Sequence, residues 1–149
     1  MPPPFTPTPN PKRTMFKNLE SLPHEQFRPT IRYTFEEIEG QPWVDAKPMT
    51  DRNKPYFNAM LQRMANVRKK LQRGKLSLQM LDTQRAILRE LCALHVITAI
   101  GGWIGPDDAE IESSRDNISA LMQQLPQRQF DEMTEALGDD DSFRPDVQG

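Results

Sequence analysis

Glycine and proline residues divide the chain between residues 55 and 138 into four segments of helical length. Gly74 follows the first segment, Gly101-Gly102 the second and Gly138 the fourth, while Pro126 separates the third from the fourth. Glycine commonly ends helices, and proline is tolerated in their first turn. Apolar residues recur in each segment at the spacing of an amphipathic helix. We therefore predict a mainly α fold, in which residues 15–138 form one helical domain with helices over about 55–73, 78–99, 114–125 and 126–137.

The first predicted helix has a recognisable start and a defined apolar face. Asn53 or Asp51 can cap it, and Pro55 suits its first turn because the missing N–H would have no partner there. The residues expected to face inward are Phe57, Met60, Leu61, Met64, Val67 and Leu71.

The remaining helices differ in how strongly their sequences define them. The second is apolar on nearly all sides in its latter half, which predicts the buried centre of the domain. Ser113 and Ser114 are candidate caps for the third helix, and Ser113 with Asp116 resembles a capping box. Pro126 begins the fourth helix and Gly138 ends it.

A β ribbon is predicted before the helices, over about residues 27–47. Ile31, Tyr33 and Phe35 alternate with polar residues, which is the period of a half-buried strand. A turn at residues 40–42 allows residues 43–46 to pair back on this strand. We expect the ribbon to pack on the helices.

Both ends of the chain differ in composition from its centre. Six of the 14 prolines fall within the first 11 positions, so residues 1–14 are predicted to be a disordered tail. Residues 139–149 are predicted to be an acidic, flexible tail, with Phe143 as a candidate anchor.

The apolar runs and the cysteine content exclude several classes of protein. The longest apolar run, residues 96–100, has about five residues, whereas a membrane-spanning helix needs roughly 20. The N-terminus shows no apolar core of signal-peptide length. Cys92 is the single cysteine, so an intrachain disulfide is impossible and a reducing compartment is expected.

The net charge of −2 conceals a strong asymmetry along the chain. Residues 52–75 contain eight Lys and Arg and no Asp or Glu, whereas residues 107–149 contain twelve acidic and three basic residues. The two segments can pair with each other, or they can present different surfaces to partners.

The sequence offers little for catalysis, metals or cofactors. His24 and His95 lack metal-ligand spacing, and the acidic runs lack the spacing of a calcium loop. Cys92 lies one turn before His95, but the interior of an apolar helix favours a packing cysteine over a nucleophile. The glycines at 101–105 follow a predicted helix and carry no Lys-Ser/Thr, so they form no phosphate loop. We predict a protein that is not an enzyme and binds no metal or cofactor.

The basic segment raises the question of nucleic-acid binding. Residues 67–75, VRKKLQRGK, could neutralise several phosphates. However, the pI of about 5.7 is low for a dedicated nucleic-acid binder, and no aromatic residues interleave with the basic ones. We expect a solvated face or an acidic protein partner instead.

Residues 91–143 resemble the C-terminal half of the tail assembly chaperones of long-tailed bacteriophages. The stretch LCALHVITAIGGWIG is followed by an acidic loop, then by SSRDNISALMQQLPQRQFDEMTEAL and DDDSF. The matching positions are Trp103, Ser114, Asn117, Leu121, Leu125, Pro126, Phe130 and Phe143. The loop after the tryptophan, the proline-rich start and the basic run at 68–75 depart from the family pattern, which leaves the partner contacts open.

The resemblance implies a phage protein that acts in the cytoplasm of the infected bacterial host and is absent from the mature virion. Such chaperones bind the tape-measure protein, keep it soluble and help recruit the major tail protein, and they can self-associate. Methionine-rich helices can cover apolar partner surfaces adaptably, although the same methionines also suit a small core. Our candidate partner-binding residues are Met60, Met64, Arg68, Lys69, Lys70, Arg73, Trp103, Met122, Phe130 and Phe143.

Two other functions remain open at this point. One is a structural component of the virion, such as a head–tail joining or tail-completion protein. The other is a small nucleic-acid-binding regulator that acts through residues 52–75.

Overall fold

The computed structural model describes residues 16–18, 26–72 and 78–145. Helices account for most of the regular structure of these residues, but the fold also contains an antiparallel sheet of strand order β1-β2-β3. The prediction of a mainly α fold is therefore right only in part. The helices are α1 Lys54–Gln72, α2 Leu78–Leu91, α3 Arg115–Gln124 and α4 Gln127–Leu137, and the strands are β1 Ile31–Thr34, β2 Trp43–Ala46 and β3 Ile97–Gly101.

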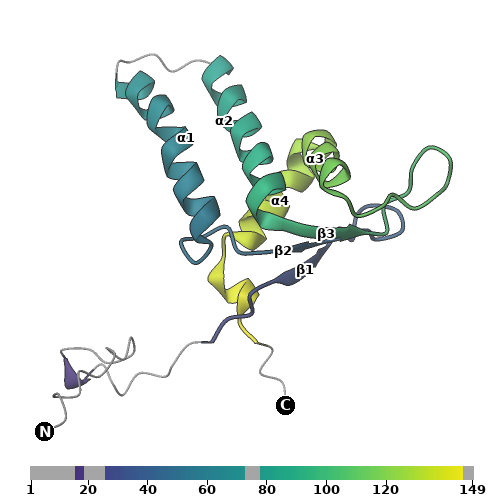
Figure 1. The fold of residues 1–149 in the computed structure, drawn as a ribbon, viewed down its shortest axis with the longest axis horizontal. Coiled ribbons are helices and arrows are strands. Elements are labelled where there is room, and N and C mark those ends of the chain that lie inside the picture. The colour runs from purple at the N-terminus through teal and green to yellow at the C-terminus, as the bar shows by residue number, and fades with distance from the viewer. Residues whose placement is uncertain (1–15, 19–25, 73–77, 146–149) are drawn as a thin grey trace, which may run out of the picture.

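The helices occupy two different positions around the sheet (Figure 1). Helices α1 and α2 stand side by side as a hairpin that extends away from the sheet, whereas α3 and α4 lie at the base of the hairpin, closer to the sheet. Arg63 of α1 and Glu90 of α2 form an ion pair across the hairpin, with 2.9 Å between Nη2 and Oε2. The molecule thus has a projecting part and a more compact body.

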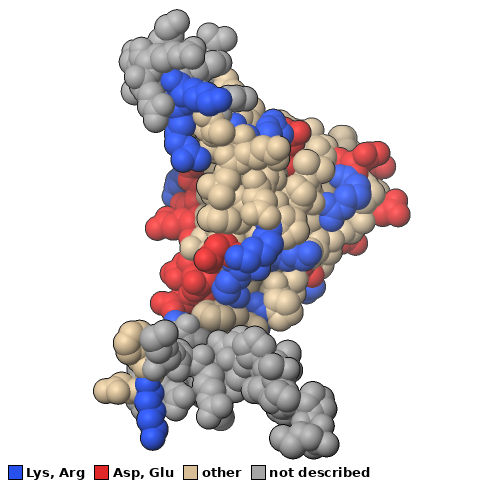
Figure 2. Space-filling model, turned by 60° about the vertical axis from the view of Figure 1, so that its left-hand side comes forward, with Lys and Arg blue, Asp and Glu red and all other residues tan. Residues whose placement is uncertain are grey.

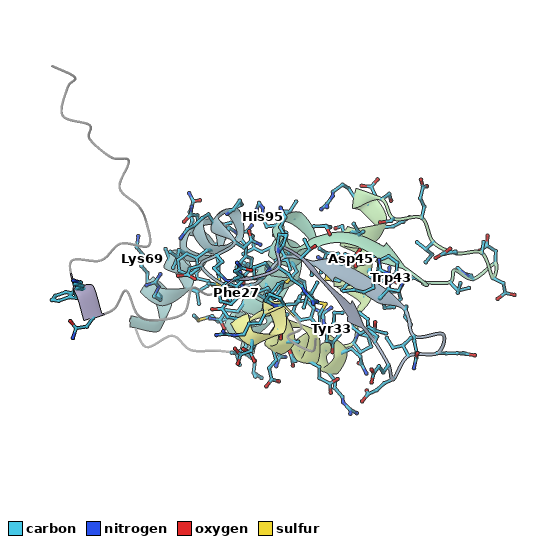
Figure 3. All side chains as sticks on the ribbon, turned by 90° about the horizontal axis from the view of Figure 1, so that it is seen from below. Phe27, Tyr33, Trp43, Asp45, Lys69 and His95 are labelled. Carbon is cyan, nitrogen blue, oxygen red and sulfur yellow. The ribbon has the colours of Figure 1, made fainter. Side chains whose placement is uncertain are left out.

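The predicted ribbon is confirmed as the β1–β2 pair. Tyr33 lies opposite Val44, and the chain reverses through Gly40 and Gln41, whose φ angles are 81° and 48°. Positive φ is readily adopted by glycine, which explains its place in this turn. Side chains alternate between the faces, and Figure 3 shows Tyr33 on the opposite side of the sheet from Trp43.

A continuous helix over residues 78–99 is the clearest wrong prediction. Helix α2 ends at Leu91, a wider π-helical turn follows over Cys92–Val96, and Ile97–Gly101 forms strand β3 against β2. The β-branched residues after position 95 favour a strand, and a third strand stabilises a ribbon that would be marginal alone. The His95 carbonyl still accepts a hydrogen bond where the helix ends, because Asn53 Nδ2 donates to it at 2.9 Å.

Helix α1 starts as predicted, but its inward face is rotated from the predicted one. Asn53 Oδ1 accepts a hydrogen bond from the Tyr56 N–H at 3.4 Å, which identifies Asn53 as the cap. Tyr56 and Val67 are buried, whereas Leu61 is 43% exposed. Successive helical positions differ by about 100°, so the buried stripe that contains Tyr56 and Val67 leaves Leu61 off the buried side of α1. The prediction that Leu61 faces inward is therefore wrong.

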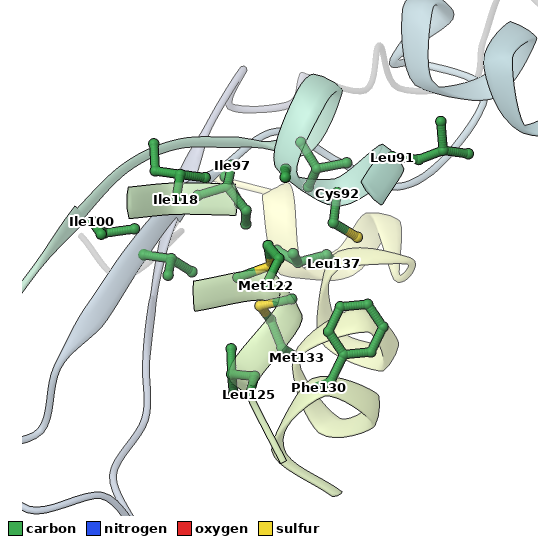
Figure 4. Close-up of a cluster of buried hydrophobic side chains, with 14 of the residues drawn as sticks. Leu91, Cys92, Ile97, Ile100, Ile118, Met122, Leu125, Phe130, Met133 and Leu137 are labelled. Carbon is green, nitrogen blue, oxygen red and sulfur yellow. The ribbon is translucent and has the colours of Figure 1, made fainter. Parts of the chain in front are cut away.

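The core lies between the sheet, the π-helical turn and helices α3 and α4 (Figure 4). Leu91, Cys92 and Val96 are buried, as expected for the apolar latter half of the predicted second helix. Leu94 is the exception, since it is 57% exposed. Arg89 Nη1 donates to the Met122 carbonyl at 2.7 Å and its guanidinium lies over the Phe130 ring, which joins α2 to α3 and α4.

The cap of α3 is Ser114, and Ser113 has another role. Ser114 Oγ accepts a hydrogen bond from the Asn117 N–H at 3.2 Å. Ser113 Oγ accepts from the Ile100 N–H at 3.0 Å and so holds the end of β3. The predicted capping box of Ser113 and Asp116 is therefore wrong, because the helix begins one residue later. Helix α4 starts at Gln127, one residue after the predicted start, because Pro126 is its N-cap residue, and it ends before Gly138 as predicted.

The beginning of the acidic C-terminal segment is an ordered part of the body, contrary to its prediction as a flexible tail. A short 3₁₀ helix covers Asp140–Phe143, and the Phe143 side chain is completely buried. Arg52 Nε donates to Asp140 Oδ1 at 3.0 Å, and the Arg28 N–H donates to the Phe143 carbonyl at 2.6 Å. The buried Phe143 ring holds this segment to the body, which the exposed carboxylates of the segment alone would not do. Residues 146–149 and the predicted tail at 1–14 lie outside the described residues.

Candidate binding surfaces

Cys92 lies in an environment that suppresses thiol chemistry. Its side chain is completely buried, and burial raises the pKa of the thiol to about 12, so it is protonated at neutral pH. Its Sγ lies 3.8 Å from Met49 Sδ, as expected for the packing cysteine predicted from the sequence. No described residues form a His, Cys, Asp and Glu cluster suited to a metal ion. No helix within the described part of the chain is long and apolar enough to cross a membrane.

The first candidate surface is on the projecting α1–α2 hairpin, and we call it the hairpin surface. Three leucines are exposed there: Leu61 by 43%, Leu78 by 81% and Leu81 by 41%. Arg68 and Lys69 are exposed near the end of α1. Figure 2 shows basic side chains close to the end of the hairpin and a broad area without charge beneath them. The hairpin surface is therefore defined by Leu61, Leu78, Leu81, Arg68 and Lys69.

Two of the predicted methionines border this surface. Met60 and Met64 are half-buried and pack against the core from α1. The Tyr56 hydroxyl lies 3.3 Å from Met60 Sδ, and burial raises the pKa of Tyr56 to about 12. Both methionines contribute to packing while leaving part of their side chains accessible. The side chain of Lys70 and the whole of Arg73 lie outside the described residues.

Three predicted contact residues belong to the core instead. Met122, Phe130 and Phe143 have no exposed surface. Phe130 and Met122 lie in the cluster that joins α3 and α4. Phe143 belongs to the same buried core and comes from the short C-terminal helix. Because a partner cannot reach these side chains in this structure, we do not include them in a binding surface.

The second candidate surface surrounds Trp103, at the far end of the sheet. The indole Nε1 donates to the Trp43 carbonyl at 3.0 Å, and the ring packs edge-on against Phe35 with 5.3 Å between centroids. The Trp103 ring borders an open cavity of about 420 Å³. The apolar side chains that line this cavity with it are Ile38, Ile100, Ile104, Ile111, Ala120, Leu121, Leu125 and Pro126. We call this surface the Trp103 pocket.

The glycines beside Trp103 make this arrangement possible. A methyl group at Gly101 would overlap the Trp43 ring, so the ring can lie over β3 only because residue 101 has no side chain. Gly102 has a φ of 77°, which allows the chain to leave the sheet before Trp103. The Gly-Trp turn at residues 101–103 thus permits close packing on Trp43 and also places Trp103 in the wall of the pocket.

Two acidic loops flank the Trp103 pocket. Residues 35–42 and 102–114 contain seven carboxylates and no Lys or Arg. Glu37 pairs with Arg128 of α4, with 3.4 Å between Oε1 and Nη2, and the Glu110 carboxylate accepts from the Gly102 N–H. The seven residues are Glu36, Glu37, Glu39, Asp107, Asp108, Glu110 and Glu112.

The structure separates the predicted contact residues into two groups. Met60, Met64, Arg68 and Lys69 come together on α1, but Trp103 lies far from them, and Figure 3 shows Lys69 on the opposite side of the molecule from Trp43. Leu78 and Leu81 were not among the predicted contact residues, although the start of α2 has more apolar residues than one buried stripe requires. The pocket was not predicted either, because its walls come from segments far apart in the chain.

Comparisons with known proteins gave no match: no family model, no curated protein and no solved structure is significantly similar to this chain.

Proposed function

We propose that this protein is a non-enzymatic tail assembly chaperone of a long-tailed bacteriophage. It binds the tape-measure protein, keeps it soluble and helps recruit the major tail protein during assembly in the host cytoplasm. The resemblance of residues 91–143 to that family supports the proposal. The binding site that we assign to the tape-measure protein is the hairpin surface.

The observation that carries this assignment is the exposure of three leucines on a projecting hairpin. Leu61, Leu78 and Leu81 lie on helices that pack on each other and extend from the body. Burial of a fully exposed leucine side chain contributes about 1.5–3 kcal/mol, so covering Leu61 and Leu81 contributes less than half of this each, and covering Leu78 contributes most of it. Leu61 lies on α1, and Leu78 and Leu81 lie on α2, so both helices of the hairpin offer apolar surface whose coverage by a partner is favourable.

The neighbouring residues suit a partner that presents varied helical segments. Met60 and Met64 are flexible and polarisable, so they can adapt to different apolar side chains. Arg68 and Lys69 can attract carboxylates at the edge of the contact, and this contribution weakens with salt. A long, mostly helical protein with exposed apolar stripes fits these properties.

Co-expression with the tape-measure protein encoded by the same phage tests the proposal. We expect the wild-type chain to keep that protein soluble and to co-elute with it in several copies on size exclusion. The double variant Leu61→Ser/Leu81→Ser should lose this effect while keeping the melting temperature of the free chain. The matched control is Leu94→Ser, which changes an exposed leucine, 57% accessible, in the π-helical turn outside both the hairpin and the Trp103 pocket.

Two results would contradict the chaperone proposal. One is a tape-measure protein that precipitates in the presence of the wild-type chain while the chain elutes alone. The other is recovery of the chain from purified virions at a fixed copy number, which would instead identify a head–tail joining or tail-completion protein. Salt-sensitive DNA binding that requires Arg68 and Lys69 would identify a nucleic-acid-binding regulator.

A further inference from the structure

The Trp103 pocket has an apolar interior formed before any ligand binds. Its cavity of about 420 Å³ is large enough for one or two large apolar side chains. The loop over residues 102–111 is held by hydrogen bonds from the Ile111 N–H to the Trp103 carbonyl at 2.7 Å and from the Gly105 N–H to the Ala109 carbonyl at 2.9 Å. Because this wall is already ordered, binding has a lower entropic cost.

Part of this apolar wall is exposed. Ile104 is 58% accessible although it lines the cavity, and it pairs with Glu110 of the same loop in an isolated β-bridge. An exposed isoleucine on a hydrogen-bonded loop beside an apolar cavity is typical of a contact surface and is not needed for the core. The pocket is therefore suited to a ligand that brings its own apolar group.

A second hollow adjoins the apolar one and differs from it in charge. It shares Ile38, Trp103 and Ile104 with the first cavity, and it is also bordered by Glu39 and Asp108. Both carboxylates are exposed, and they belong to the two loops that contain no Lys or Arg. A ligand that fills the apolar cavity therefore meets negative charge next to it.

We propose that the Trp103 pocket docks a basic amphipathic segment of a partner protein. A large apolar side chain of the segment occupies the cavity between β3 and α3, and adjacent Lys or Arg side chains lie against Glu39 and Asp108. Charge complementarity selects this occupant, because acidic or uncharged segments gain nothing from the loops. The inference does not rest on the chaperone function, since it concerns a surface away from the hairpin.

Fluorescence anisotropy with designed peptides tests the two parts of the proposal separately. The probe is a labelled 15-residue helical peptide with leucines on one face and lysines on the other. One comparison peptide replaces every lysine by glutamate, and another replaces every leucine by alanine. We expect the lysine–leucine peptide to bind, its affinity to fall with salt, and both comparison peptides to fail.

Variants of the full chain locate the binding site. Ala120→Phe adds volume at the cavity wall and is expected to abolish binding. Glu39→Gln/Asp108→Asn removes two charges and should weaken binding about two- to tenfold, as expected for two exposed ion pairs. Asparagine is chosen at 108 because that residue has a φ of 60°, which asparagine tolerates. The charge-matched control Asp82→Asn/Glu135→Gln changes exposed carboxylates that do not line the pocket and should bind like the wild type.

Several outcomes would overturn the proposal. Binding that is unchanged in Ala120→Phe, or weakened equally by the control variant, would show a nonspecific attraction to an acidic protein. Preference for the glutamate peptide would contradict the assigned charge. Concentration-dependent self-association in sedimentation velocity that Ala120→Phe removes would make a second copy the occupant. Circular dichroism and thermal melting of each variant distinguish a lost site from a lost fold.

Discussion

The α1–α2 hairpin and the body formed by the sheet, α3 and α4 use their apolar residues in different ways. In the body, side chains such as Phe130, Met133 and Leu137 are completely buried. In the hairpin, α2 begins with Leu78 and Leu81 exposed, and Leu61 of α1 is exposed as well. The two regions also differ in charge, because α1 carries basic residues and no acidic ones, while the body carries the acidic loops.

This difference suggests that the body mainly determines the stability of the fold and that the exposed residues of the hairpin are available for binding. Residues of the body are packed on several sides, so their substitution should mainly change the free energy of unfolding. Exposed residues of the hairpin contribute little to that free energy, so their substitution should mainly change partner binding.

Phe143→Ala should destabilise the protein most strongly. The variant removes a completely buried aromatic side chain, and comparable substitutions cost about 3–5 kcal/mol. Urea unfolding followed by circular dichroism measures the change, with Leu61→Ala in the hairpin as the comparison. A loss below about 1 kcal/mol would show that the C-terminal segment is not part of the cooperative body.

Gly101→Ala should have the next largest effect. The added methyl group would overlap the Trp43 ring, so either the ring or strand β3 must move, at a cost of about 1–3 kcal/mol. Tryptophan fluorescence and thermal melting report this change. Gly105→Ala is the matched control, since the closest atom to its methyl group would be the end of the Asp107 side chain at 3.2 Å, with Ala109 and Ile111 at an ordinary 3.6 Å. Equal effects of the two variants would contradict the packing role of Gly101.

The stability of the body should fall as the pH rises above 9. The folded chain holds the Cys92 proton up to a pKa of about 12, whereas the unfolded chain releases it near pH 9. Stability is therefore fully present below pH 9 and is lost at about 1.4 kcal/mol per pH unit above it. Urea unfolding between pH 8.5 and 10 measures the slope, before Tyr56 contributes strongly. Cys92→Ala should flatten the slope, and an unchanged slope would assign it to other groups.

Ser114→Ala should cost about 1 kcal/mol, because it removes the oxygen that accepts from the Asn117 N–H at the start of α3. Ser114→Asp restores an acceptor and should recover most of the loss. Chemical denaturation of the three proteins provides the measurement. An alanine variant as stable as the wild type would show that this cap is dispensable.

Leu61→Ser/Leu81→Ser should have the smallest effect on the free chain. Each side chain is more than 40% exposed, so we expect a change within about 0.5 kcal/mol per site. Thermal melting of the variant and the wild type checks this directly. A large loss of stability would show that these leucines complete the core, and it would remove the distinction between hairpin and body.

The parts of the fold that depend on local sequence were predictable. The ribbon follows from alternation around Tyr33, and helices α3 and α4 follow from their apolar stripes and from Pro126 and Gly138. Strand β3 was not predictable by periodicity, because a short apolar run fits a buried helix as well as a strand. Its β-branched residues, Ile97, Thr98 and Ile100, were the available signal.

The binding surfaces were only partly predictable, since exposure depends on which neighbour each face meets. Met60 and Arg68 were found because methionines and basic residues gather along α1. Phe130 and Phe143 are large apolar residues of the kind that also occurs at contact surfaces, but tertiary packing buries them. The Trp103 pocket requires the approach of Ile38, Ile100 and Leu121, whose proximity no local pattern encodes.

Hydrogen–deuterium exchange of the chain alone and with the co-expressed tape-measure protein tests the proposed role of the hairpin surface. We expect amide protection to rise in peptides covering residues 54–72 and 78–91. Protection of residues 115–137 should change little, because they already belong to the packed body. A stable complex in which the hairpin peptides gain no protection would contradict the claim that the hairpin surface binds the partner.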